Sequence, residues 1–150
     1  MRTVKNIIDT KPQPSNIISP TAMVIDALTM MNSVNLSYLI VMEDEEVKGL
    51  FSERDYSRNV VLKGRSSSSS KVEDVMATDL PTVSPADTVE QCMNTMIRHK
   101  SRYLLAFDGA KFLGVITIHD LLREVIANKE GVFDGPAQAL LDSDESHFVY

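Results

Sequence analysis

Residues 49–56 read Gly49-Leu50-Phe51-Ser52-Glu53-Arg54-Asp55-Tyr56, and residues 114–121 read Gly114-Val115-Ile116-Thr117-Ile118-His119-Asp120-Leu121. Both stretches contain a glycine, two apolar residues, a hydroxyl residue, two variable residues and then an aspartate. Each therefore predicts a short buried strand that runs directly into the first turn of a helix. Two occurrences in one chain indicate an internal repeat, which decides the fold.

The repeat extends well beyond these two stretches. Residues 17–62 superpose on residues 82–127 without a gap, at a shift of 65 positions. The identical pairs are Ser19/Ser84, Pro20/Pro85, Val24/Val89, Met31/Met96, Tyr38/Tyr103, Leu39/Leu104, Gly49/Gly114, Asp55/Asp120, Arg58/Arg123 and Val60/Val125. Residues 4–8 also echo residues 72–76, but at a shift of 68, so the first copy has about three extra residues within 9–16. The chain is a duplication.

Each copy predicts the order β-α-β-β-α over about 60 residues. Strands are expected at 16–18, 38–42 and 47–51 in copy one, and at 81–83, 103–107 and 112–116 in copy two. The Ser-Pro pairs at 19–20 and 84–85 predict the start of the first helix. Its apolar face has the spacing 0, 3, 4, 7 in both copies: Val24, Ala27, Leu28 and Met31, then Val89, Cys92, Met93 and Met96. The last helix is expected to follow Ser52 or Thr117 and to end near residue 62 or 127.

These elements predict an α+β fold in which two small copies pack sheet to sheet with pseudo-two-fold symmetry, since one copy alone buries little surface. The expected domains are residues 4–63 and 72–130. Residues 64–71, which include five consecutive serines, are expected to be a flexible linker. Residues 131–150 are expected to be a loose tail, and whether 137–141 form a docking turn stays open.

Composition excludes several classes of protein. The chain has 150 residues, a net charge of −6 and one cysteine, Cys92. The negative charge argues against nucleic-acid binding, although residues 54–71 and 98–102 are locally basic. No apolar run approaches the roughly 20 residues of a membrane span, and residues 1–6 lack the apolar stretch of a secretory signal, so a cytoplasmic location is expected. The three histidines have no zinc-ligand spacing, and no metal is expected.

The hydroxyl residue and the aspartate three positions later have two readings. Ser or Thr followed by an acid at this spacing is a capping box, which starts a helix without any ligand. A carboxylate in a first helical turn can also accept hydrogen bonds from the two adjacent hydroxyls of a ribose. The amides at the same helix end favour a phosphate or ribose oxygen. For one such motif alone, capping is the favoured reading.

Residues 4–127 resemble a pair of cystathionine-β-synthase (CBS) domains, often called a Bateman module, and especially small bacterial and archaeal proteins that consist of little else. The most specific segments are residues 51–56 with Arg58 and residues 61–67. Residues 72–76 with 81–85 come next. One departure concerns the first hairpin strand, where the family usually has Leu-Pro-Val-Val. This chain has Leu39-Ile40-Val41 and Leu104-Leu105-Ala106, which restores a backbone donor.

The resemblance implies an adenosine-type ligand (AMP, ADP or ATP, with NAD or S-adenosylmethionine as alternatives), a homodimer and a protein partner not identified by sequence. No cofactor is required. It implies that Asp55 and Asp120 hold the ribose, with Ser52 and Thr117 beside the ribose and phosphate. The other implied ligand-binding positions are Ile18, Thr82, Val83, the backbone near Leu39 and Leu104, and the phosphate partners Arg54, Arg58 and Arg102, with His119 in the place of Arg54.

Three functions follow, and the leading one is a nucleotide-responsive regulatory module without catalysis. The second is a structural or dimerisation module that has lost its ligand, which the missing prolines favour. The third is an enzyme, which the sequence disfavours. No hydroxyl or thiol has a histidine–acid partner, and Cys92 falls on the expected buried helix face.

Overall fold

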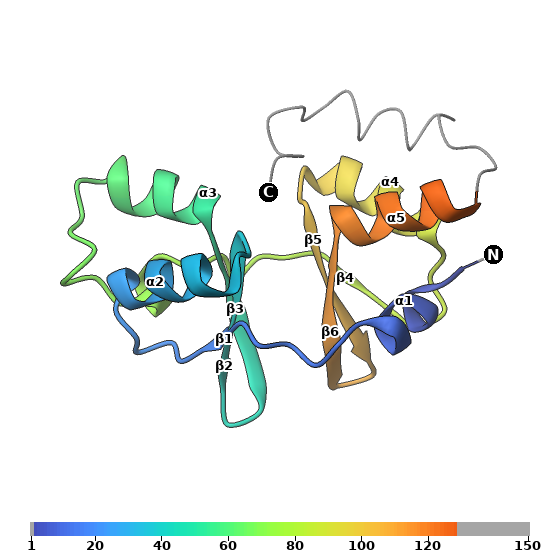
Figure 1. Ribbon diagram of the computed structural model, residues 1–150, viewed down its shortest axis with the longest axis horizontal. Helices are drawn as coiled ribbons and strands as arrows, with labels where there is room; N and C mark the ends of the chain where they lie inside the picture. Colours follow the sequence, from blue (N-terminus) through green and yellow to red (C-terminus); the bar gives the residue numbers. More distant parts are fainter. Residues whose placement is uncertain (1, 129–150) are drawn as a thin grey trace. The chain divides into compact units, whose positions relative to one another are not determined.

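A computed structural model describes residues 2–128, which form two compact units, each with a three-stranded sheet (Figure 1). Residues 13–79 make one unit, which contains Asp55 and is called the Asp55 unit below. Residues 2–12 and 80–128 together make the other, the Asp120 unit. The mixed α+β class expected from the sequence is confirmed. The tail at 131–150, with its candidate docking turn, lies outside the described residues.

The Asp55 unit follows the order expected for copy one. Its elements are β1 (Ile17–Ile18), α2 (Val24–Val34), β2 (Tyr38–Glu43), β3 (Glu46–Ser52), α3 (Glu53–Asp55), the π-helix η1 (Tyr56–Val61) and the 3₁₀ turn η2 (Val72–Asp74). β1 pairs parallel to β2, and β2 pairs antiparallel to β3 with Leu39 opposite Phe51. This register carries the chain from β3 straight into Ser52 and α3.

The Asp120 unit repeats this sheet in copy two. Its elements are α1 (Val4–Thr10), β4 (Thr82–Val83), α4 (Val89–His99), β5 (Tyr103–Asp108), β6 (Lys111–Thr117) and α5 (Ile118–Asn128). β4 is parallel to β5, and β5 is antiparallel to β6 with Leu104 opposite Ile116. The β-α-β-β-α order is therefore confirmed in both copies, with strand ends within about one residue of those expected.

The first helix of each copy begins later than the Ser-Pro signal predicted. α2 begins at Val24 and α4 at Val89. In copy two the prediction fails because the Asp87 carboxylate accepts a hydrogen bond from the Ser84 amide, which closes a turn after the proline. Thr88 then starts α4 with a capping box to Gln91.

The last helix is regular only in copy two. α5 runs as one α-helix, whereas copy one has a single turn, α3, and then widens into η1. Asn59 in η1 donates from Nδ2 to the carbonyl of Val75 at 2.9 Å, which ties the widened turn to the segment after η2. Residues three apart are no longer stacked on one face in a π-helix, so copy one orients its side chains differently.

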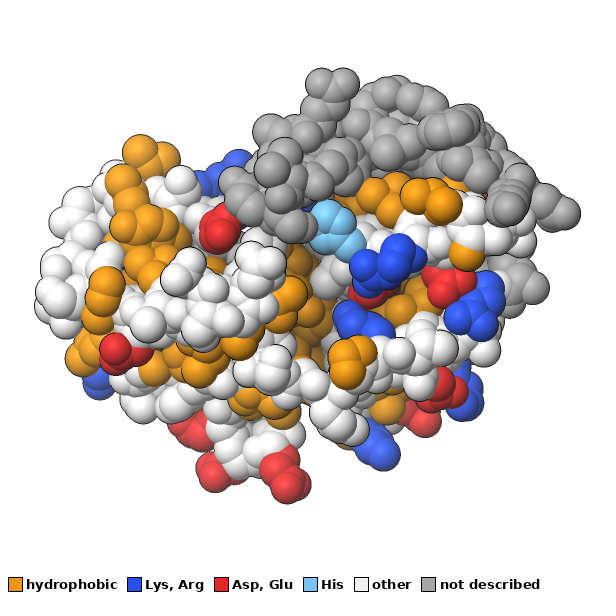
Figure 2. Space-filling view, in the orientation of Figure 1, with side chains coloured by type: hydrophobic (Ala, Val, Ile, Leu, Met, Phe, Trp, Pro, Cys, Tyr) orange, Lys and Arg blue, Asp and Glu red, His pale blue; other side chains and the backbone are white. Residues whose placement is uncertain are grey.

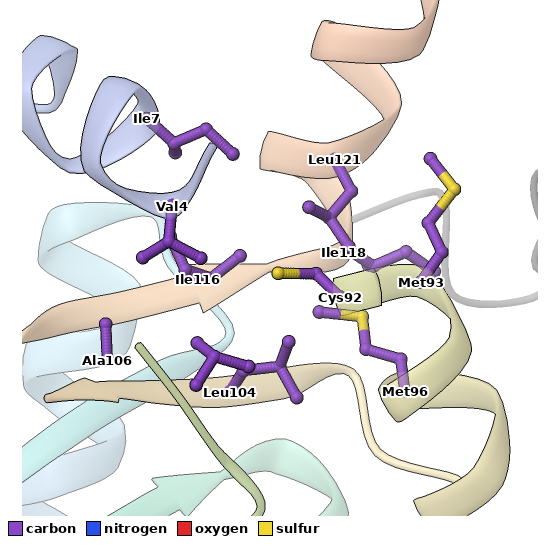
Figure 3. Packing of buried hydrophobic residues seen from close by; sticks show 11 residues of the cluster. Val4, Ile7, Cys92, Met93, Met96, Leu104, Ala106, Ile116, Ile118 and Leu121 are labelled. Carbon is purple, nitrogen blue, oxygen red and sulfur yellow. The ribbon is translucent and has the colours of Figure 1, made fainter. Parts of the chain in front are cut away.

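Each unit has its own apolar core. The Asp120 core includes Val4, Ile7, Cys92, Met96, Leu104, Ile116 and Leu121 (Figure 3). The Asp55 core includes Ala27, Met31, Leu39, Phe51, Val60, Val72 and Val75. The apolar helix faces expected from the 0, 3, 4, 7 spacing thus face inward, and Cys92 is buried as predicted.

The segment that begins each sequence copy packs in the unit of the other copy. α1 precedes copy one along the chain, but its Val4 and Ile7 are buried in the Asp120 core. Conversely, Val72 and Val75, which open copy two, are buried in the Asp55 core. The compact units therefore differ from the sequence repeats by an exchange of these opening segments.

The serine run is built into the Asp55 unit. Composition predicted a flexible linker, yet the carbonyls of Ser70 and Ser67 accept hydrogen bonds at 2.9 Å from the amides of Val24 and Ile25. These are the first amides of α2, which have no partner within the helix. The segment therefore acts as the cap of α2, a role that Met23 cannot perform with its side chain.

The surface of the Asp55 unit combines apolar and acidic regions. Val61 and Leu62 are exposed at the end of η1, and apolar side chains reach the surface there (Figure 2). Residues 43–46, Glu-Asp-Glu-Glu, are exposed at the tip of the β2–β3 hairpin. Across residues 2–128 no helix is both long and apolar enough to cross a membrane.

Candidate functional site

The motif of copy one forms a compact polar site where β3 ends. The amide and the hydroxyl of Ser52 both donate to Oδ2 of Asp55 at 2.9 Å, and the Asp55 amide donates back to the Ser52 hydroxyl at 3.3 Å. This reciprocal pair is the capping box predicted from the spacing. Within residues 2–128, only Oδ2 of Asp55 carries hydrogen bonds, so Oδ1 keeps its capacity to accept.

The motif of copy two forms the same box in the Asp120 unit. The Thr117 amide donates to Oδ2 of Asp120 at 2.9 Å, and the Asp120 amide donates to the Thr117 hydroxyl at 3.2 Å. The carbonyl of Arg102 accepts the Ile118 amide, as that of Ser37 accepts the Glu53 amide in copy one. The local backbone of the two sites is thus equivalent.

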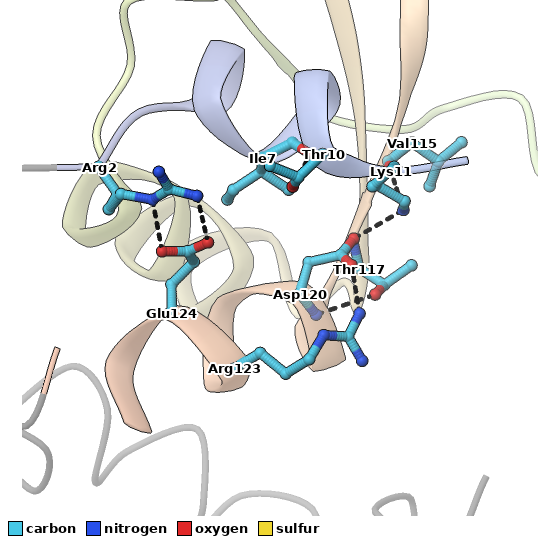
Figure 4. Close-up of polar contacts among 9 residues, drawn as sticks. All are labelled: Arg2, Ile7, Thr10, Lys11, Val115, Thr117, Asp120, Arg123 and Glu124. Atoms are coloured by element: carbon cyan, nitrogen blue, oxygen red, sulfur yellow. Dashed lines mark hydrogen bonds and ion pairs between the residues drawn. The ribbon is translucent and has the colours of Figure 1, made fainter. Parts of the chain in front are cut away.

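The two aspartates differ in what else they bind. Nζ of Lys11 donates to Oδ2 of Asp120 and to the carbonyl of Val115, each at 2.8 Å (Figure 4). Nη2 of Arg123 reaches Oδ1 of Asp120 at 2.7 Å. Both carboxylate oxygens of Asp120 are therefore engaged by cations of the same unit, and its side chain is only 3% exposed.

Their pKa values shift in opposite directions for this reason. Burial raises the pKa of Asp55 above its ordinary value, and the hydrogen bonds from Ser52, with the charges of Arg54 and Arg58, offset this only in part. Burial also opposes ionisation of Asp120, but the charge and hydrogen bond of Lys11 outweigh it and lower the pKa. The Asp55 carboxylate, which no cation within residues 2–128 contacts by a hydrogen bond, is thus costly to ionise.

We expect Asp55→Asn to leave stability at pH 7 unchanged or to raise it by up to about 1 kcal/mol, because an amide oxygen can still accept from Ser52. Because the folded-state pKa of Asp55 is raised, the free energy of unfolding of the parent falls as pH rises from the unfolded value of about 4 through the folded-state pKa. Over that range the unfolded carboxyl is already ionised, whereas the folded one still holds its proton. The variant lacks that loss of stability. Urea unfolding of both proteins between pH 4 and 7 measures the difference, and a large loss of stability at pH 7 would contradict it.

The remaining predicted ligand residues divide by exposure. Ile18 and Val83 are almost completely buried, as are Leu39 and Leu104, whose side chains belong to the cores and leave only backbone for a ligand. Thr82 and Arg58 are exposed, and Arg54 and Arg102 are half-buried. Burial, with the charge of Arg123, lowers the pKa of His119, so this side chain is neutral at pH 7.

The backbone donor that the missing prolines restore is used inside the sheet. The Ile40 amide donates to the carbonyl of Asn16 at 2.8 Å, and the Leu105 amide donates to that of Pro81 at 3.0 Å. Both bonds join the short first strand of a copy to its neighbour. The departure from the family pattern therefore strengthens strand pairing and adds no donor for a ligand.

Two residues of the Asp120 site were not among those predicted. Arg123 had a signal, because it is the identical repeat partner of Arg58. Lys11 had none, since it lies in the stretch of copy one that has no gap-free counterpart.

Neither a metal cluster nor a reactive thiol was found in the described part of the chain. No three His, Cys, Asp or Glu residues converge there, and burial raises the pKa of the Cys92 thiol to about 12.

Comparisons with known proteins agree with the fold and the repeat. The model of the CBS domain family matches residues 4–61 and 72–127. A putative signal-transduction protein with CBS domains from Burkholderia ambifaria is 34% identical, with a TM-score of 0.78, and the match covers 86% of this chain and 97% of that one.

Two further similar proteins are a longer relative and a solved structure of lower sequence identity. The mitochondrial CBS domain-containing protein CBSX3 of Arabidopsis thaliana is 33% identical over 69% of this chain, which spans about half (52%) of that relative's length. The structure of CBSX2 in complex with AMP, 21% identical with a TM-score of 0.68, shares the fold over 85% of this chain and 98% of that one.

Proposed function

The chain belongs to the CBS-domain family, as a pair of such domains of the regulatory type, and from that premise we propose that it binds an adenosine-type nucleotide (AMP, ADP or ATP) without transforming it. A change of ligand state would be read by a protein partner. The binding needs neither a metal nor another cofactor. We also propose that the chain acts as a homodimer.

The observation that carries the proposal is the unfilled carboxylate oxygen at Asp55. Ser52 orients the carboxylate through Oδ2, while Oδ1 accepts no hydrogen bond within the described residues. A ribose offers two adjacent hydroxyl donors, and these can satisfy a half-buried carboxylate that is costly to leave unpaired. Arg54 and Arg58 act on the charge of Asp55 and supply positive potential for a phosphate. The AMP complex of CBSX2 supports this ligand class.

The second candidate is a structural or dimerisation module that binds no ligand. The specific observation in its favour is Asp120, whose two oxygens are already engaged by Lys11 and Arg123. A site filled in this way needs no ligand to be stable. This candidate predicts a dimer in light scattering whose melting temperature does not respond to millimolar nucleotide.

We expect isothermal titration calorimetry to detect AMP, ADP or ATP binding to the parent, and Asp55→Ala to weaken that binding at least tenfold, about 1.4 kcal/mol, because the charged acceptor of the ribose is lost. NAD and S-adenosylmethionine complete the panel. Asp26→Ala removes the same charge from an exposed position of the same unit and is the matched control. Absence of heat with every compound would exclude the proposed function.

A further inference from the structure

The two copies have the same motif, yet only one of them is paired with cations from its own unit. Asp55 and Asp120 occupy equivalent positions, and so do Arg58 and Arg123. Arg123 contacts Asp120 from the regular helix α5. Arg58 lies in the π-helix η1, where a residue three positions on is no longer stacked above Asp55. The helix type therefore accounts for one of the two cations.

The exchanged segment accounts for the other. In the Asp55 unit, the carbonyl of Leu50 accepts the amide of Ala77 at 2.8 Å, from the segment that follows η2. Val115 is the repeat partner of Leu50, but its carbonyl accepts Nζ of Lys11. The donor to this strand carbonyl is thus a backbone amide, that of Ala77, in the Asp55 unit and a lysine side chain in the Asp120 unit. The same ammonium group lies 2.8 Å from Oδ2 of Asp120.

No residue of the corresponding segment can act in the same way on Asp55. Residues 72–79 read Val-Glu-Asp-Val-Met-Ala-Thr-Asp and contain neither lysine nor arginine. Lys11, in contrast, is held at the end of α1, where its own amide donates to the carbonyl of Ile8. The Lys11 side chain is 27% exposed, whereas that of its partner Asp120 is 3% exposed.

We propose that Lys11 is a built-in competitor for the Asp120 site, so that an adenosine-type ligand takes the Asp55 site first and reaches Asp120 only by displacing the Lys11 ammonium group. The inference rests on the proposed function, because it concerns the same class of ligand. Oδ2 of Asp120 already accepts the Thr117 amide and the Lys11 ammonium group, so a ribose hydroxyl can bond to that oxygen only if the ammonium group leaves. Lys11 on Oδ2, together with Arg123 on Oδ1, therefore makes the two matching motifs unequal in their capacity to accept a ligand.

The test isolates the Asp120 site by removing the other one. In an Asp55→Ala background, Lys11→Met keeps most of the apolar stem but removes the ammonium group. We expect AMP to bind this double variant at least tenfold more tightly than it binds Asp55→Ala alone, by calorimetry. Lys5→Met in the same background is the matched control, since Lys5 lies on the same helix and pairs with Asp9 at the surface. It should leave AMP affinity unchanged.

A second measurement follows the lysine itself. Amine acetylation read by mass spectrometry should modify Lys11 faster in the parent when AMP is saturating, while the rate at Lys5 stays constant. Circular dichroism checks that each variant is folded. We expect Lys11→Met to fold, because Arg123 still neutralises Asp120 when Lys11 is replaced.

The outcomes separate this inference from the proposed function. If the parent binds AMP through Asp55 but Lys11→Met changes nothing, the competitor role is wrong and the function stands. If Lys11→Met weakens AMP binding at Asp120, Lys11 is a phosphate partner and the competitor role is again wrong. If neither the parent nor any variant binds AMP, the competitor role fails together with the AMP form of the function.

Discussion

Asp120→Ala is expected to destabilise the Asp120 unit by about 3 kcal/mol at pH 7. The substitution removes the hydrogen bond from the Thr117 amide to the carboxylate, which is worth about 1 kcal/mol, and leaves two cations without their partner. We expect a smaller loss than the largest ones seen when a buried ion pair is broken, because the Arg123 side chain is 71% exposed and can turn to solvent. Urea unfolding followed by circular dichroism measures the change.

The pH dependence of this loss has a definite sign. The pKa of Asp120 is lowered in the folded state, so its contribution is present above the unfolded value of about 4 and disappears as pH falls through the lower folded-state pKa. The difference between parent and Asp120→Ala should therefore shrink below about pH 4. Asp9→Ala breaks only the exposed pair with Lys5 and should leave stability nearly unchanged at every pH, because solvent screens that pair. A loss that is the same at all pH values would argue against the ion pair as its source.

Gly49→Ala is expected to cost the Asp55 unit about 3 kcal/mol. A Cβ atom at Gly49 would lie 2.4 Å from the carbonyl oxygen of Ala77, which is backbone and cannot rotate away. The strand and the exchanged segment must then separate, which weakens the two backbone hydrogen bonds between Leu50 and Ala77 at 2.8 and 3.0 Å. Thermal and urea unfolding of the full chain measure the loss.

Gly109→Ala is the control for backbone strain alone. Gly109 has a φ of 60° at the β5–β6 hairpin, but a Cβ there would meet no atom within 4 Å. That substitution should cost only about 1 kcal/mol, the usual penalty for a side chain in the left-handed region. Equal losses for the two variants would mean that close packing of residues 72–79 does not explain the glycine at 49.

The capping boxes were predictable because they depend on local spacing. Ser52 and Asp55, like Thr117 and Asp120, lie three residues apart at the start of a helix, and this distance along the chain brings the hydroxyl and the carboxylate together in any helix. The helix starts at the Ser-Pro pairs were wrong, because a proline tolerated in a first helical turn is equally suited to a turn. Capping by Thr88 decided the matter in copy two.

The sequence by itself determined the duplication, the order of strands and helices and the inward faces of those helices, because hydrophobic periodicity and turn residues act over a few neighbouring positions. Only the tertiary structure decided that each opening segment packs in the other unit. That exchange joins Lys11 to Asp120, 109 residues apart. No local pattern encodes such a pair, because it forms only when α1 packs against β6. The pair makes two matching motifs chemically unequal.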